Sequence, residues 1–403
     1  MGLEVAIPVV ALAIGAYLLR SRRLRASESW RATLTPLASI MGSGFLISAP
    51  LLAGIVGVWA LPCMAALLAV AYGLGEVLRF NIRHFEPIEH GPACPPQSVA
   101  LLSRLVLAAA YFVSVSYYLQ LLATFALDAF GLADPVLANV VTTALLVVIA
   151  GIGMWRGLEE LESVETYAVS LNLGMIGALL LTLLFHNGAL LLDGSWKLPA
   201  VESSIDLGDL RVLLGLLIVV QGFETSRYLG GEHSAEVRIR TMRSAQLIAA
   251  AVYLVFVGGT TVLFHDGLGA DVTAILELTA PIAAILPVLL SLAAIGSQFS
   301  AAVADTSGAA GLLEELAPKR LRARHAYVLL LAVTIAITWG TDVNGVIAYA
   351  SRGFALYYAL QGLVALLVLR EDGALTSRGP RYALYGSMTA VGFAVFLFGL
   401  PTG

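Results

Sequence analysis

Apolar runs long enough to cross a lipid bilayer recur along the whole chain. Backbone polar groups in lipid must pair internally, which favours helices over open strands. Only 12% of the 403 residues are charged, whereas soluble domains carry about 25%. At about 20 residues per span, the sequence predicts an all-α integral membrane protein with about 12 transmembrane helices. We place the spans at 3–20, 33–55, 58–80, 99–129, 134–154, 165–186, 209–230, 243–265, 279–304, 325–340, 343–369 and 383–400.

Positive charge is distributed unevenly between alternate loops. Of the 23 lysine and arginine residues, one set of loops holds all but Lys197, Arg211, Arg227 and Arg352. The first two of these lie in the other set of loops, and the last two fall within or near spans. Cytoplasmic loops carry the excess of lysine and arginine. The bias therefore predicts a multi-pass protein of the cell membrane with both termini outside the cytoplasm.

Several classes of function lack their sequence signature. No glycine-rich loop ends in Lys-Ser or Lys-Thr, no His-Glu-x-x-His occurs, and Cys63 and Cys94 give no metal-binding spacing. No mid-span histidine or Ser-Lys pair indicates an enzyme. No basic stripe with interleaved aromatic residues indicates a nucleic-acid partner. We therefore expect no metal, no cofactor and no catalytic activity. The expected partners are the lipid bilayer and a small-molecule substrate, and the oligomeric state stays open.

Two spans carry residues that a plain lipid-facing helix does not need. Span 33–55 contains Met41-Gly42-Ser43-Gly44, and Pro50 follows it. Span 209–230 contains Gly222-Phe223-Glu224-Thr225. Glycine permits non-helical backbone, and proline removes a hydrogen-bond donor. The alternative for the glycines is close helix packing by small residues.

The two interrupted spans lie five spans apart, so the helices around them run in opposite directions. Spans two to six and seven to eleven then form two inverted halves of similar length. We divide the chain into an added first helix with a basic loop (1–31), two five-helix repeats (32–187 and 188–369) and a last helix (370–403). Interrupted segments at matching places in two halves indicate a transporter binding site. Half-helix ends there offer N–H groups to an anion and carbonyl groups to a cation.

These motifs resemble those of the amino acid–polyamine–organocation (APC) superfamily, which has the inverted-repeat fold of the leucine transporter. Ile40-Met41-Gly42-Ser43-Gly44-Phe45 is similar to the first core helix of that family, and Gly222-Phe223-Glu224 to its sixth. Trp155-Arg156-Gly157 is similar to the entrance of its fifth. Two features depart from the pattern. Asn172 stands where some members have a lysine that replaces a sodium ion, and the first span is additional. The Asp-Pro-Gly and Met-Pro-His breaks of related manganese carriers are missing.

The resemblance implies a secondary active transporter that works by alternating access and is coupled to a proton or sodium gradient. The implied substrate is an amino acid or a related amine. The implied substrate-binding residues are Met41, Gly42, Ser43, Gly44, Ile47, Tyr117, Gly222, Phe223, Glu224 and Thr225. The implied ion-coupling or gating residues are Glu224, Asn172, Ser300, Asp305 and Arg352.

Each charged candidate has a structural alternative, because a charge near the bilayer centre costs at least about 2.5 kcal/mol and needs a reason. Glu224 either binds a cation or proton, or ties the broken helix together as a hydrogen-bond acceptor. Asp305 is an ion ligand, an inner gate or an interfacial carboxylate. Arg352 pairs with a carboxylate or extends outward. Arg227, three residues after Glu224, is a candidate partner for it, and Tyr117 is alternatively a packed aromatic residue.

Two other functions remain open at this stage. One is transport of a different substrate by the same fold, such as a nucleobase, an organic cation or an inorganic ion. The other is a membrane sensor that binds without transport. We also expect a short capping helix over 271–278, which is a candidate lid.

Overall fold

The computed structural model describes residues 2–42, 44–89, 91, 94–132, 134–156, 159–201, 203–230, 233–269, 271–316, 323–371 and 378–400. Over these residues the chain is helical and contains no strand. The elements are α1 (Gly2–Arg20), α2 (Arg22–Ala26), α3 (Glu28–Gly42), α4 (Phe45–Val56), η1 (Gly57–Trp59), α5 (Ala60–His84), η2 (Glu86–Ile88), α6 (Pro95–Asp128), α7 (Pro135–Arg156), α8 (Glu159–Leu192), α9 (Leu207–Gly215), η3 (Leu217–Val220), α10 (Thr225–Tyr228), α11 (Ala235–Thr260), η4 (Thr261–Leu263), α12 (Ala274–Thr279), α13 (Ile285–Leu316), α14 (Ala323–Gly340), α15 (Val343–Glu371) and α16 (Arg378–Phe398).

The predicted all-α membrane architecture is confirmed. Nine stretches within the described residues are long and apolar enough to cross a membrane. One of them, Glu28–His84, holds the two predicted spans 33–55 and 58–80. The predicted spans 209–230 and 325–340 correspond to the broken segment α9–α10 and to the shorter helix α14.

The span predicted at 279–304 has the wrong boundaries. The short helix α12 ends at Thr279, and α13 begins only at Ile285 and continues to Leu316. Pro281 lies in this gap and has no backbone N–H with which to continue the hydrogen bonds of α12. The short helix expected over 271–278 is present as α12, which packs on α4 and α13.

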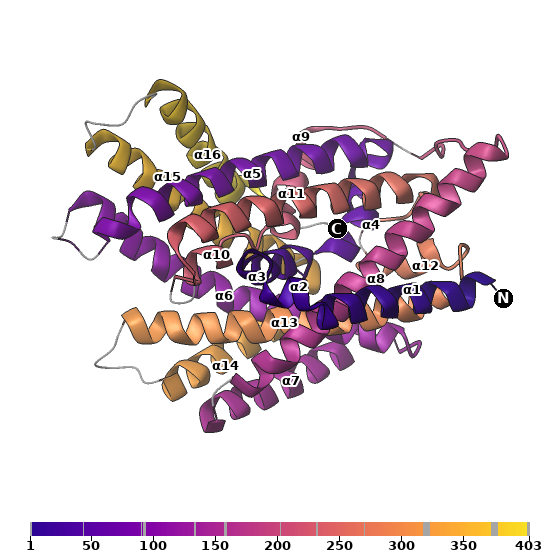
Figure 1. The fold of residues 1–403 in the computed structure, drawn as a ribbon, viewed down its shortest axis with the longest axis horizontal. Helices are drawn as coiled ribbons and strands as arrows, with labels where there is room; N and C mark the ends of the chain where they lie inside the picture. Colours follow the sequence, from indigo (N-terminus) through magenta and orange to yellow (C-terminus); the bar gives the residue numbers. More distant parts are fainter. Residues whose placement is uncertain are drawn as a thin grey trace.

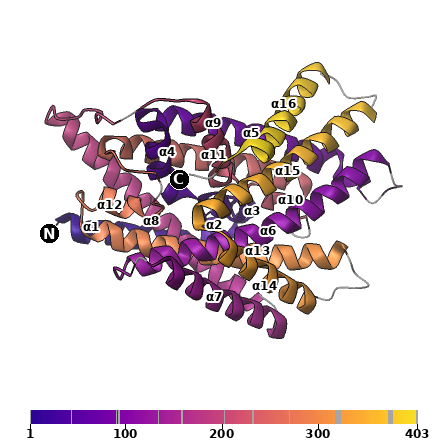
Figure 2. The same ribbon diagram turned by 180° about the vertical axis from the view of Figure 1, so that it is seen from behind.

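The long helices run broadly along one axis, and α6 lies in the interior of the bundle (Figures 1 and 2). It packs against α13 and α15, while α7 and α14 lie side by side at one edge (Figure 1). On the other side, α11 packs on α3 and α5. The buried aromatic side chains of the main hydrophobic core include Tyr117 and Tyr118 of α6 and Tyr357 and Tyr358 of α15.

The two interrupted segments cross each other in antiparallel fashion. The first half of one, α3, contacts the second half of the other, α10. The second half of the first, α4, contacts the first half of the other, α9. A polar cap fixes the start of α9, where the Asp206 side chain accepts from the Asp209 N–H and the Asp209 side chain accepts in return. The antiparallel crossing is the arrangement expected from two inverted halves.

The added helix α1 packs on α8 and α13 (Figure 1). Small residues allow the close approach, since a Cβ at Gly174 would lie 2.4 Å from the Ala11 carbonyl oxygen, and one at Gly15 3.3 Å from that of Ser170. At its other end, both carboxylate oxygens of Glu4 accept backbone N–H bonds from Ala284 and Ile285, each at 2.9 Å. The helix α1 therefore packs along α8 and binds α13 at the point where α13 begins.

Candidate functional site

The first helix break lies between α3 and α4. The helix α3 ends at Gly42, and α4 begins at Phe45 after Gly44, whereas Ser43 lies outside the described residues. Pro50, which we expected to contribute to the interruption, instead lies inside α4. A helix start exposes N–H groups that have no partner within the helix and carries partial positive charge. The start of α4 therefore provides donors for an anionic group in the interior of the bundle.

The second break is longer than the sequence predicts. The helix α9 ends at Gly215, a 3-10 turn follows over Leu217–Val220, and α10 begins only at Thr225. Gly222 has a φ of 116°, which side chains other than glycine rarely adopt. The residues from Gln221 to Glu224 are therefore a non-helical crossing rather than a kink.

The two breaks are in direct contact. A Cβ added to Gly44 would lie 2.6 Å from a Val219 side-chain carbon, and one added to Gly222 would lie 2.6 Å from the Ser39 carbonyl carbon. The hydroxyl of Tyr253, on α11, donates to the Val219 carbonyl and lies 3.0 Å from the Ile40 carbonyl oxygen. The glycines thus allow two backbones to meet, and Tyr253 contacts a carbonyl from each.

Glu224 is buried at this crossing, with 1% of its surface exposed. Its Oε2 accepts from the Gly222 N–H at 3.0 Å and from the Tyr358 hydroxyl at 2.6 Å. The Phe223 ring stacks on Tyr358 with centroids 5.2 Å apart. One carboxylate oxygen therefore has the structural role that we gave as an alternative, and it links the break to α15. Phe223 forms a wall beside it.

A small cavity of about 30 Å³ lies beside the breaks. It gathers four of the predicted ion-coupling and substrate residues, Asn172, Ser300, Asp305 and Thr225, from α8, α13 and α10. The other lining residues are Thr35, Ala38, Ser39, Val169, Ser297, Ala301 and Ala304. Space for a water-sized group needs about 10–15 Å³, so the cavity accommodates an ion or one or two waters. Oxygen atoms of amide, hydroxyl and carboxylate groups suit a hard cation.

Asp305 is buried, with 6% of its surface exposed, rather than interfacial. The Ser114 hydroxyl of α6 donates to its Oδ2. The carboxylate therefore belongs to the packed interior between α6 and α13.

Other predicted residues lie elsewhere. Met41, Ile47 and Tyr117 are buried in the hydrophobic core and are not among the described residues that line this cavity. Arg352 binds no carboxylate among the described residues, and its guanidinium donates to the Gly399 carbonyl instead. Gly399 follows α16, which packs against α15 and so brings this carbonyl to Arg352.

Sequence reasoning missed several residues around the breaks. The side chain of Gln298 donates to the Gly42 carbonyl at 2.9 Å, and Ser297 lines the cavity. Ser297 and Ser300 are three residues apart on one face of α13, a spacing that the sequence shows. Tyr253 and Tyr358 gave no local signal, because their partners are far away in the sequence.

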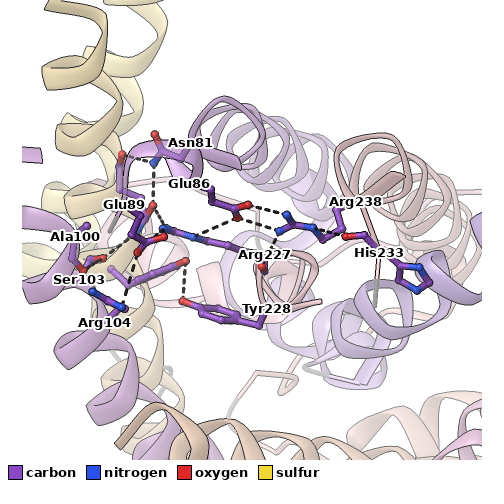
Figure 3. Close-up of polar contacts among 12 residues, drawn as sticks. Asn81, Glu86, Glu89, Ala100, Ser103, Arg104, Arg227, Tyr228, His233 and Arg238 are labelled. Carbon is purple, nitrogen blue, oxygen red and sulfur yellow. Dashed lines mark hydrogen bonds and ion pairs between the residues drawn. The ribbon is translucent and has the colours of Figure 1, made fainter. Parts of the chain in front are cut away.

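The expected Arg227–Glu224 pair is also wrong. Figure 3 shows the Arg227 side chain directed to Glu86 and Glu89, in the turn between α5 and α6. Its Nη2 lies 3.4 Å from Glu89 Oε1, and its Nη1 donates to Gln361. Arg238 binds both oxygens of Glu86, at 2.9 and 2.7 Å, and its Nη1 also donates to the Arg227 carbonyl at 2.8 Å. This charge network anchors the end of α10.

Comparisons with known proteins cover most of the chain. A family model described as "APC superfamily transporter" matches residues 22–399. An uncharacterized protein of Aquifex aeolicus (strain VF5) is 40% identical over 355 residues, which is 86% of this chain and 86% of that protein.

Two solved structures have a similar fold. A mutant of the Eremococcus coleocola manganese transporter gives a TM-score of 0.57 at 11% identity, covering 91% of this chain and 86% of the other. A Na+-coupled sialic acid symporter, in a substrate-bound outward-open state, gives 0.50 at 15% identity, covering 100% and 97%. At these identities the two structures establish the shared fold of inverted helical repeats and nothing finer.

Proposed function

Because the chain belongs to the APC superfamily of transporters, we propose that it moves a small organic solute, an amino acid or a related amine, across the cell membrane by alternating access. Membership and fold make it a multi-pass membrane protein and a secondary transporter. The substrate, the coupling ion, the membrane and the orientation of the termini are the parts that we propose.

This proposal rests on the direct contact between the two breaks. Two interrupted segments that cross in antiparallel sense bring the start of α4 and the non-helical stretch 221–224 to one place. The N–H groups of the α4 start suit a substrate carboxylate. The buried Glu224 carboxylate suits a substrate ammonium group. An amino acid carries both groups, which is why we favour it over a nucleobase.

We propose that the small cavity holds the coupling cation, with sodium as the first candidate. Ser300, Asn172 and Asp305 supply oxygen atoms from two helices, and Thr225 adds one from α10. Because α10 belongs to a broken segment, a cation there favours the arrangement in which this segment approaches α13. Coupling of this kind requires that the ion bind one arrangement better than the other.

Proton coupling through Glu224 is the second candidate. The carboxylate is buried and accepts from the Tyr358 hydroxyl. Protonation would remove its charge and one acceptor position, which would weaken the link between the break and α15.

The first experiment is a thermal-shift screen of the purified protein with amino acids, amines and nucleobases, each with and without sodium and at two pH values. A ligand at ~100 times its Kd adds about 2.7 kcal/mol of stability. We expect a selective shift from an amino acid or amine. If only nucleobases or inorganic ions shift the protein, the proposed substrate class is wrong.

The second experiment measures uptake of the identified substrate into proteoliposomes under a sodium gradient or a pH gradient. We expect Asp305→Asn to abolish accumulation driven by sodium while substrate binding is kept. Glu224→Gln removes the proposed ammonium partner and should weaken substrate binding under either gradient; at saturating substrate, loss of its pH-driven accumulation alone identifies proton coupling. Glu236→Gln is the matched control, because Glu236 is an exposed carboxylate at the start of α11. If neither site variant changes the gradient dependence, both coupling assignments are wrong.

A further inference from the structure

A second, larger cavity of about 500 Å³ lies away from the helix breaks. It forms where α6 and α14 end and where α7 and α15 begin, at the end of the bundle that we predict to be extracytoplasmic. The pair α7 and α14 is visible along the lower edge in Figure 2. The cavity is lined by Gln120, Thr124, Leu127, Asp134, Pro135, Ala138, Asn139, Trp339, Gly340, Thr341, Asp342 and Val343. Its volume lies in the range of small-molecule sites, roughly 300–1,000 Å³.

Negative charge lines this cavity. Asp134 and Asp342 are its charged lining residues, and neither lysine, arginine nor histidine is among them. One oxygen of each carboxylate caps a helix start, accepting from the Leu137 N–H at 2.8 Å and from the Gly345 N–H at 2.7 Å. Both aspartates are exposed, so each keeps carboxylate surface that a group in the cavity can reach. The two aspartates therefore each retain an acceptor for a positively charged group.

A buried amide points to the same chemistry. Gln120 lines the cavity and is 3% exposed. Its Nε2 donates to the Thr338 carbonyl at 3.2 Å, but its Oε1 accepts no hydrogen bond from any described residue. A buried acceptor without a partner is unfavourable and uncommon in folded proteins. A ligand with an N–H donor would satisfy it.

The remaining lining provides an apolar surface and an aromatic ring. Trp339 is held in place because its Nε1 donates to the Thr143 hydroxyl at 3.0 Å. Indole is the preferred aromatic partner of an ammonium group. Leu127, Pro135 and Val343 add carbon surface.

We propose that this cavity is a second binding site, distinct from the central one, for a protonated amine attached to an apolar group. The carboxylates of Asp134 and Asp342 and the unpartnered Oε1 of Gln120 bind the ammonium N–H groups, and Trp339 with the aliphatic side chains binds the apolar part. The amine comes either from solution or from the ethanolamine headgroup of a lipid, which carries the same donor. The proposal is independent of the central substrate.

Hexylamine is the probe, titrated against the purified full-length protein in an uncharged detergent with hexanol as the neutral comparison. Binding is measured by thermal shift. Asp134→Asn and Asp342→Asn remove the charge but keep a good helix-capping residue, so the fold is preserved. We expect each to weaken hexylamine binding about fivefold, as for a favourable exposed ion pair. Asp206→Asn, at a helix cap outside the cavity, is the matched control and leaves binding unchanged.

Two results would overturn the proposal. One is equal binding of hexanol and hexylamine, which would make the cavity merely apolar. The other is unchanged hexylamine affinity in the Asp134→Asn/Asp342→Asn double variant. Hexylamine binding is then measured in nanodiscs of phosphatidylglycerol, with and without phosphatidylethanolamine, to distinguish a soluble amine from a lipid headgroup. Competition by phosphatidylethanolamine assigns the site to lipid, and its absence assigns the site to soluble amines.

Discussion

Replacing Gly222 with alanine tests the contact between the two breaks. The substitution adds one methyl group at a position whose φ is 116°. That methyl group would lie 2.6 Å from both the carbonyl carbon and the Oγ of Ser39, and 2.7 Å from the Ile40 backbone nitrogen. Two of these atoms are backbone, which cannot move aside by a change of rotamer. The two broken segments must therefore separate by several tenths of an ångström, or Gly222 must adopt another conformation.

The expected cost has two parts. A sparsely populated backbone conformation costs about 1–3 kcal/mol, and overpacking of a filled interior adds typically 1–3 kcal/mol. We expect a total loss of at least about 3 kcal/mol. With an unfolding entropy of about 2.1 cal/mol/K per residue, the 403-residue chain loses roughly 1 °C of Tm per kcal/mol. Gly222→Ala should therefore lower Tm by about 3 °C or more, and substrate affinity should fall with it.

Two other glycines separate the two causes. Gly131 has a φ of 69° and open space around it, so Gly131→Ala carries backbone strain alone, about 1–2 kcal/mol. Gly151 lies inside α7 with open space, so Gly151→Ala should stabilise by about 0.5–1 kcal/mol. Tm is measured for all three variants in one detergent. If the Tm of Gly222→Ala is no lower than that of Gly131→Ala, the two breaks are not in the close contact described above.

Three further predictions follow from particular contacts. Gly42→Leu should abolish substrate binding in the thermal-shift assay, because a side chain there meets Ser297; retained binding would show that Gly42 only packs. Arg227→Met should destabilise by about 3 kcal/mol, since it leaves Glu89 without its nearest cation, and a double variant with Glu89→Gln should lose less than the sum of the single losses. Glu4→Ala should cost about 1 kcal/mol through the lost cap of α13, and an unchanged Tm would indicate that the cap is unimportant.

Much of the fold follows from the sequence because the bilayer limits the possible structures. Apolar runs predicted the helical membrane architecture, and the paired interruptions predicted the two broken segments that cross. The boundary of α13 was predicted less well, because hydropathy does not distinguish a short outer helix and turn from the start of a span. Pro281 lies in this turn and removes one backbone donor, which is a local effect.

The candidate site was predicted only where local chemistry marks it. The sequence predicted that Asn172, Ser300 and Asp305 belong to the site, and they line one cavity. The sequence did not predict that Arg227 would bind Glu86 and Glu89 in the turn between α5 and α6. Side chains three residues apart meet only on a continuous helix, which is absent here. Since α10 has only four residues, Glu224 and Arg227 are directed to different neighbours. Long-range partners such as Tyr358 leave no pattern in one sequence.

The added helix α1 restricts which motions the molecule can make. It joins α8 to α13, and these two helices supply most of the wall around Asn172 and Asp305. Because α1 contacts both helices, sliding of α8 past α13 would break the Glu4 cap. The broken segments are held instead by side chains of Tyr253, Tyr358 and Arg227, which a change of rotamer can release. In mechanical terms, we expect the extra span to stiffen one side of the bundle and to leave the opening motion to the broken segments.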